Sequence, residues 1–211
     1  GREDRYRDAS EQFHRYGLCR LVEFYRPTRP TDEDVAANGV KSRGKFGSWT
    51  SHQRVCARFA AAAGAGDRLV VFEDDVQFLG EMTDERVARL HGQVRGMPDD
   101  WHVLLLGHSP MPVPGTCRPA NMFASDWSVW RTNSFMLHAY LLSEAGARLM
   151  AATPYHAYAS IDYGVVGRGR GSVREHFLDD WMRQNANMYA VLPMMCVQAD
   201  SMCTSSAVVS P

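Results

Sequence analysis

Lysine is scarce in this chain of 211 residues. Lys41 and Lys45 are the only two, so arginine supplies 21 of the 23 basic side chains. No lysine follows residue 45, which excludes a receiver-type phosphorylation domain, because that domain needs a lysine late in the chain. The formal net charge of −1 gives no support for nucleic acid as a partner, because that binding depends on an excess of basic side chains.

Several motifs that would assign a function are also absent. The chain has no GxxxxGK[ST] phosphate-binding loop, no HExxH zinc motif and no GxSxG nucleophile elbow. Its apolar runs are too short to span a membrane, and no signal peptide is visible. We therefore expect no transmembrane segment in this stretch of chain, and both the cytoplasm and the secretory lumen stay open as its compartment.

Cysteine is present but is not spaced for metal binding. The five cysteines, at positions 19, 56, 117, 196 and 203, form no CxxC pair. A structural zinc site is therefore not expected, and an odd number of cysteines cannot all pair. A single Cys19–Cys56 or Cys196–Cys203 bridge stays open beside the more common state of buried free thiols.

The most informative stretch is LVVFEDDV at 69–76, in which an apolar run leads into three acids. An apolar run without alternation favours a strand buried on both faces. The carboxylates of Glu73, Asp74 and Asp75 cannot share that burial, because an unpaired buried charge is very costly, so they belong at the end of the strand. Close acids repel one another unless a cation lies among them. A divalent metal that carries phosphate and a solvated acidic turn are both open interpretations.

The rest of the chain alternates between helix and strand signals. We expect helices over about 4–16, 48–63, 83–94, 143–152 and 178–187, and strands over about 19–25, 69–72, 101–107, 133–140 and 188–192. This order predicts an α/β fold with a mostly parallel central sheet flanked by helices. We expect a single domain over 1–198 and a tail over 199–211. No strand signal precedes the first helix, although an α/β domain normally begins with a strand. We therefore expect that the opening strand of the domain is missing from this sequence.

The spacing of the acids favours metal chemistry. Successive residues of an extended chain point to opposite sides, so Glu73 and Asp75 can face one ligand together. One of them can hold a metal, while the other meets a ribose hydroxyl or supports the first. The metal would neutralise the departing diphosphate of a nucleotide-activated donor.

The acids also belong to a series of motifs that runs through most of the chain. The series is DR at 4–5, GSWTSH at 47–52, the acidic strand end, WHVLLLG at 101–107, AYLLS at 139–143 with GA at 146–147, and DWM at 180–182 with Pro193 and Gln198. In this order it resembles glycosyltransferase family 25, which includes bacterial lipopolysaccharide galactosyltransferases and procollagen galactosyltransferases. The chain departs from the family pattern at Ser48, where the family has cysteine, and at His102, where it has aspartate.

This resemblance implies a GT-A-like nucleotide-sugar-binding fold and a DxD-type acidic motif. It implies transfer of a hexose, with galactose as the first candidate, from a UDP-sugar donor to an acceptor hydroxyl. The transfer would invert the anomeric configuration and use Mn2+ or Mg2+. The acceptors that it implies are a glycan, a lipooligosaccharide or a hydroxylysine-type protein side chain.

The resemblance also implies roles for individual side chains. The expected metal ligands are Asp75 and Glu73. The side chains expected around the nucleotide and donor sugar are Arg5, Ser51, His52, Glu73 and Asp74.

Inversion requires a carboxylate that takes the proton of the acceptor hydroxyl. Asp180 is the first candidate, because it aligns with the late aspartate of the family. Asp179 and Asp162 compete with it, and a solvated surface role stays open for all three.

Two further functions stay open at this point. The first is a metal-dependent nucleotidyltransferase that uses the same acidic strand end. The second is a catalytically inactive, glycosyltransferase-like binding module. Five aromatic residues in the irregular segments 108–132 and 154–172 could either stack on an acceptor sugar or fasten those segments to the core: Trp127, Trp130, Tyr155, Tyr158 and Tyr163.

Overall fold

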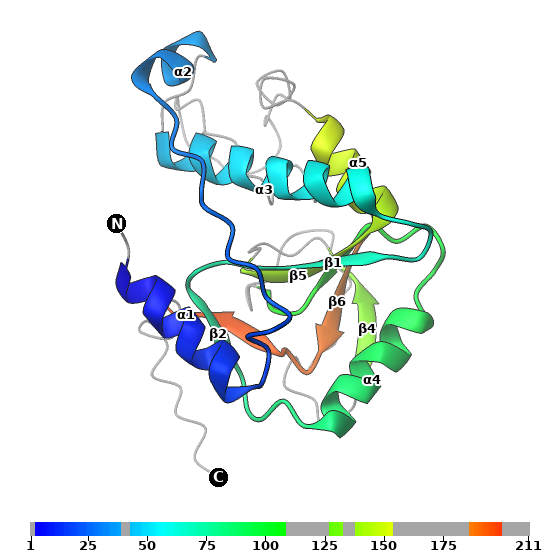
Figure 1. Ribbon diagram of the computed structural model, residues 1–211. Helices are drawn as coiled ribbons and strands as arrows, with labels where there is room; N and C mark the ends of the chain where they lie inside the picture. The colour runs from blue at the N-terminus through cyan, green and yellow to red at the C-terminus, as the bar shows by residue number, and fades with distance from the viewer. Residues whose placement is uncertain (1–2, 39–42, 109–126, 133–137, 154–185, 200–211) are drawn as a thin grey trace, which may run out of the picture.

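The computed structural model describes residues 3–38, 43–108, 127–132, 138–153 and 186–199. The helices are α1 (Glu3–Arg15), α2 (Asp32–Ala37), α3 (Arg43–Ala62), α4 (Asp84–Arg95) and α5 (Glu144–Ala152). The strands are β1 (Arg68–Phe72), β2 (Val76–Phe78), β3 (Val103–Leu105), β4 (Ser128–Arg131), β5 (Ala139–Ser143), β6 (Met188–Leu192) and β7 (Cys196–Gln198). In Figure 1, α3 and α5 lie above the central strands, and α1 and α4 lie below them. The predicted mixture of helices and strands is confirmed.

The central sheet has the strand order β1-β5-β3-β6-β4. The pair β3–β6 is parallel, whereas β1–β5, β3–β5 and β4–β6 are antiparallel. The prediction of a mostly parallel sheet is therefore wrong for the described strands. An apolar run indicates that both faces of a strand are covered. It does not indicate whether the strand runs parallel or antiparallel to its neighbours. Strands β1, β3 and β6 nevertheless run in the same direction, as expected. Strand β5 lies between β1 and β3 and runs in the opposite direction.

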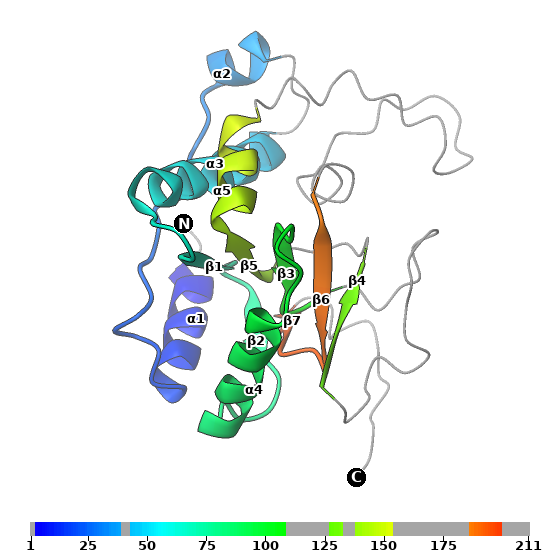
Figure 2. The same cartoon turned by 90° about the vertical axis from the view of Figure 1, so that its right-hand side faces the viewer.

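Each face of the sheet has its own apolar core, because successive strand residues point to opposite faces. On one face α3 and α5 pack against the strands through Trp49, Cys56, Ala147, Met150, Val103, Leu105, Tyr140 and Leu142. On the other face α1 and α4 do the same through Ala9, Phe13, Val94, Leu104, Leu141 and Val191. Figure 2 shows α3 and α5 above β1 and β5, and α1 and α4 below them. The two cores fix the strand ends from which the acids emerge.

Strand β1 lies at one edge of the central sheet, and this corrects the expectation of a strand buried on both faces. Its described partner is β5, with Val71 opposite Tyr140. Val70 is 45% exposed, because the strand has no described neighbour beyond it and no helix covers this position fully. Phe72 is held instead by α1, where its ring centroid lies 5.5 Å from that of Phe13.

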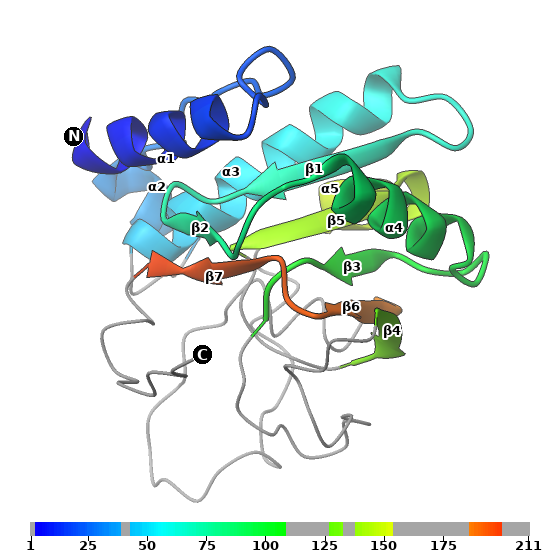
Figure 3. The same ribbon diagram turned by 90° about the horizontal axis from the view of Figure 1, so that it is seen from below.

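A second, two-stranded sheet joins β2 to β7, with Gln77 opposite Val197. Figure 3 shows this pair beside the end of β1 and close to α1. The side-chain amide of Gln12 on α1 extends the pairing: its Nε2 donates to Val76 O at 2.7 Å, and its Oε1 accepts from Phe78 N at 2.9 Å. The sequence prediction missed both strands, because three residues give too short a pattern.

Several local predictions were confirmed and others were wrong. Helices α4 and α5 begin where expected, after Thr83 and Ser143, whose side-chain oxygens cap them. Gly17 ends the first helical segment with φ of 69°. In contrast, α3 begins at Arg43 rather than at position 48, α2 was not predicted, and 19–25 is not a strand. The helix expected over 178–187 lies mostly outside the described residues.

The described cysteines, Cys19, Cys56 and Cys196, are free, so the Cys19–Cys56 bridge does not form. Burial raises the pKa of the Cys56 thiol to about 12, which keeps it protonated. Among the described helices, none combines the length and apolar character needed to cross a membrane.

Candidate functional site

The three acids follow β1 directly, as the apolar-to-acidic pattern predicts. Backbone hydrogen bonds hold the turn: Glu73 N donates to His138 O at 2.9 Å, and Val76 N donates to Glu73 O at 3.2 Å. The acids differ in exposure, since Asp74 is exposed, Glu73 is half-buried and Asp75 is only 8% exposed. The turn therefore presents one surface carboxylate and one almost fully buried carboxylate. We refer to Glu73, Asp74 and Asp75 as the acid cluster.

Helix α1 supplies a cation to the acid cluster. Nη1 of Arg5 lies 3.1 Å from Asp74 Oδ1 and 2.8 Å from Asp75 Oδ2. The Arg5 side chain is 23% exposed, so water screens these ion pairs less than those of a fully exposed pair. The sequence placed Arg5 near the donor, and the structure brings it onto the acids themselves.

Asp75 is the most enclosed member of the acid cluster, and its two oxygens have different surroundings. Oδ2 accepts hydrogen bonds from Arg5 and, at 2.9 Å, from Nε2 of Gln198. Oδ1 is buried and has no hydrogen-bond partner among the described residues. A buried carboxylate oxygen without a partner costs free energy, about 1–3 kcal/mol for a typical polar group and more for a charged one. Such an oxygen fits a site that a cation or a donor group completes.

His52 on α3 is also brought to the acid cluster, where it connects Glu73 to the protein core. Its Nε2 lies 3.3 Å from Glu73 Oε1, and its Nδ1 lies 2.5 Å from the hydroxyl of Tyr140. His52 is 9% exposed, and its ring stacks on that of Tyr140 with a centroid distance of 5.8 Å. It therefore does not lie on a solvated helix face.

Ser51, the neighbour of His52 in the sequence, has a different role. Its hydroxyl donates to Gly47 O at 2.6 Å and accepts from Thr28 N at 2.8 Å. A Cβ on Gly47 would lie 2.9 Å from Thr28 O, so this position has room only for glycine. Ser51 thus fastens the preceding loop to α3, and its expected contact with a nucleotide has no support in these hydrogen bonds.

The three candidate bases, Asp162, Asp179 and Asp180, lie outside the described residues. The same holds for Tyr155, Tyr158 and Tyr163 among the aromatic residues. Their roles stay predictions.

Sequence reasoning missed three side chains of the site. Tyr140 and Gln198 stood inside the recognised motifs but were given no role. Gln12 lies seven residues after Arg5 on the same face of α1, so helical periodicity could have found it. All three hold the backbone or the side chains around the acid cluster.

The residues present fit a divalent metal that is shared with a phosphate ligand. No group of three or more potential metal-binding side chains occurs among the described residues. Mg2+ typically binds through one or two carboxylates and completes its coordination with substrate phosphates and water, so a full protein cage is not required. Asp75 with its unpartnered Oδ1 and the half-buried Glu73 can supply such a pair.

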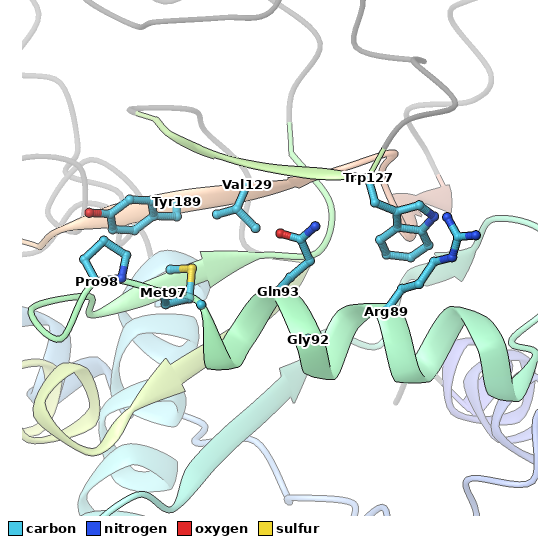
Figure 4. A pocket seen from close by; sticks show the side chains of 9 residues that line it. Arg89, Gly92, Gln93, Met97, Pro98, Trp127, Val129 and Tyr189 are labelled. Atoms are coloured by element: carbon cyan, nitrogen blue, oxygen red, sulfur yellow. The ribbon is translucent and has the colours of Figure 1, made fainter.

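A separate groove of about 570 Å³ lies between α4 and the strands β4 and β6. Figure 4 shows Trp127 beside Arg89 at one end, Tyr189 beside Pro98 and Met97 at the other, and Gln93 between them. Trp127 thus lines a groove, as an acceptor-binding aromatic would, but the guanidinium of Arg86 also lies 6.0 Å from its ring centroid. Trp130 is 39% exposed on β4.

Comparison of the chain with protein-family models and with curated proteins finds no match.

Proposed function

We propose that the chain is a metal-assisted glycosyltransferase domain of the GT-A-like type, in which the acid cluster binds the donor. The donor would be a UDP-hexose, with galactose as the first sugar to test, and an acceptor hydroxyl would displace the nucleotide with inversion. The acceptor would be a glycan, a lipooligosaccharide or a hydroxylysine-type side chain. The single observation that carries the proposal is the buried Oδ1 of Asp75, which lacks a partner among the described residues.

The convergence of distant motif residues supports the same proposal. Arg5, His52 and Gln198 come from α1, α3 and β7, and each contacts Asp75, Asp74 or Glu73. They lie in the DR, GSWTSH and closing Gln motifs on which the family resemblance rests. If these separate motifs resembled the family only by chance, there would be no reason for their side chains to meet in the folded chain.

The direction of the strands adds a second argument. Strands β1, β3 and β6 run the same way, so their C-terminal ends meet at one edge of the sheet. In open α/β sheets ligands bind outside the carboxyl ends of the strands. The acid cluster stands at that edge, directly after β1.

Asp75 and Glu73 would hold the metal, and Asp74 and Arg5 would meet the donor. A bound divalent cation supplies positive charge to the leaving diphosphate. Arg5 offers a second cation, because a guanidinium pairs with phosphate as readily as with carboxylate. One of Asp180, Asp179 and Asp162 would take the proton of the acceptor hydroxyl.

A turnover assay tests the proposal. The full chain is incubated with Mn2+ and a panel of UDP-hexoses or nucleoside triphosphates, and release of UDP or pyrophosphate is measured. We expect UDP release from a UDP-hexose, loss of that release in Asp75→Asn, and no change in Asp99→Asn, which alters an exposed acid in a distant turn. Turnover of triphosphates alone would instead indicate a nucleotidyltransferase. UDP binding without turnover of any donor would indicate an inactive binding module.

A further inference from the structure

We propose that Tyr140 is a positioning residue for the acid cluster, because its hydroxyl fixes the tautomer of His52 and thereby the orientation of Glu73. The arrangement of Tyr140 and His52 stands on its own geometry. Its consequence for ligand binding rests on the proposed function of the acid cluster.

Tyr140 is held rigidly in the middle of the sheet. It lies on β5 with Val71 opposite on β1 and Leu105 opposite on β3. Its exposed fraction is 0%, and it belongs to the core between the sheet and α3. The strand pairing and the core therefore hold Tyr140 in place, and its hydroxyl lies 2.5 Å from Nδ1 of His52.

The protons of this pair can be assigned by elimination. Burial, and secondarily the nearby Cys56 and Glu73, raises the pKa of Tyr140 well above 10, so the hydroxyl keeps its proton. A buried O–H needs an acceptor, and His52 Nδ1 is its hydrogen-bond partner among the described residues. Tyr140 therefore donates to Nδ1, and the ring proton of a neutral His52 must be on Nε2.

The tautomer of His52 determines whether the Glu73 carboxylate accepts a hydrogen bond from it. Nε2 of His52 lies 3.3 Å from Glu73 Oε1, so in this tautomer its N–H donates a hydrogen bond to the carboxylate. The opposite tautomer would place a lone pair against a carboxylate, which repels it. The hydrogen bond occupies Oε1 and leaves Oε2 as the oxygen for a ligand. Groups that orient metal ligands in this way typically contribute about 10- to 100-fold to metal affinity.

The tautomer is tested by ¹⁵N NMR of the full chain, without any ligand. The His52 signals are assigned by their loss in His52→Gln. We expect protonated Nε2 and unprotonated Nδ1 in the wild type, and a mixture of tautomers in Tyr140→Phe, which removes only the hydroxyl. Protonated Nδ1 in the wild type, or an unchanged spectrum in Tyr140→Phe, would overturn the assignment.

The positioning role is tested by the affinity for UDP with Mn2+. Tyr140→Phe should weaken it about 10- to 100-fold. The control Tyr16→Phe also removes a hydrogen-bonded hydroxyl, here one that donates to Gly80 O at 2.9 Å, and should not change it. In a His52→Gln background, Tyr140→Phe should lower the affinity for UDP little further. The side-chain amide of glutamine has no tautomers, so Tyr140 has none to fix. A full additional loss in that background would show a general structural effect and contradict the inference.

The two proposals fail in different ways. Absence of UDP binding by the wild type contradicts the proposed function, and the NMR result then still decides whether Tyr140 sets the tautomer of His52. Normal binding in Tyr140→Phe, with the tautomer released, contradicts the positioning role alone.

Discussion

Arg5 Nη1 lies 2.8 Å from Asp75 Oδ2, although 70 positions separate the two residues in the sequence. The same nitrogen lies 3.1 Å from Asp74 Oδ1, so one cation bridges two carboxylates. A divalent metal at the acid cluster would draw on the same negative charge. Arg5 and a metal ion therefore compete for these acids when no phosphate is present.

Arg5→Ala is expected to raise the affinity for Mn2+ alone by about tenfold, which corresponds to the loss of a competing interaction of about 1.4 kcal/mol. The same variant should bind UDP in the presence of Mn2+ more weakly, because the donor loses a cationic partner. Titration calorimetry with each ligand measures both effects. Arg7→Ala, which alters an exposed arginine on the same helix, should change neither affinity. A lower Mn2+ affinity in Arg5→Ala would contradict the competition.

The loop that follows β3 depends on the absence of a side chain at Gly107. A Cβ there would overlap the ring of His138 and the carbonyl of Cys196. Gly107→Ala should therefore lower the free energy of unfolding by about 3 kcal/mol, the upper end of the usual overpacking range. Chemical denaturation monitored by circular dichroism measures this change.

Gly92→Ala is the matched control for that substitution. Gly92 lies inside α4, and a Cβ there would have no heavy atom within 4 Å. Alanine should stabilise the helix by about 0.5–1 kcal/mol relative to glycine. Equal destabilisation by both substitutions would contradict the close packing at Gly107.

Stability is expected to fall as the pH decreases from 7.5 to 5.5, and His102 contributes to this fall. Nδ1 of His102 accepts from Asn187 N at 2.9 Å, which requires an unprotonated nitrogen. Burial lowers the pKa of His102 below 6.5, and the charge of Asp100 opposes this only in part. The unfolded chain therefore binds the proton first as the pH drops through 6.5, so the folded state loses stability in that interval.

Urea denaturation at the two pH values measures the pH effect in wild type and in His102→Asp. Aspartate is the residue that the resembled family has at this position, and its carboxylate can also accept a hydrogen bond from Asn187 N. The variant should lose less stability on acidification than the wild type. A larger loss in the variant would contradict the role given to His102.

The sequence allowed good prediction of those features that depend on neighbouring residues. The starts of α4 and α5 were predicted close to their observed positions, because a hydroxyl such as that of Thr83 or Ser143 can bind backbone N–H groups only a few positions later. The acid cluster at the end of β1 was found because charge cannot follow an apolar strand into the core. The family resemblance singled out Arg5 and His52 as donor-site residues, and both contact these acids.

Features that depend on distant pairing were not predicted correctly. The three-residue strands β2 and β7 pair across about 120 residues, and neither has a pattern of its own. The insertion of β5 between β1 and β3 determines both the mixed direction of the sheet and the location of Tyr140, and no local signal encodes it. The acids were expected to escape burial at the end of the strand, but Asp75 is only 8% exposed, because Gln198 and Arg5 cover it.

The central claim is that Asp75 binds a nucleotide diphosphate through a divalent metal. Titration calorimetry of the full chain with UDP, in the presence and absence of Mn2+, tests it most directly, with Asp75→Asn and the control Asp99→Asn measured alongside. We expect UDP binding with Mn2+ in the wild type and the control, and its loss when Mn2+ is omitted or Asp75 is replaced. Equal binding in all these conditions, or no UDP binding by the wild type with Mn2+, would contradict the claim.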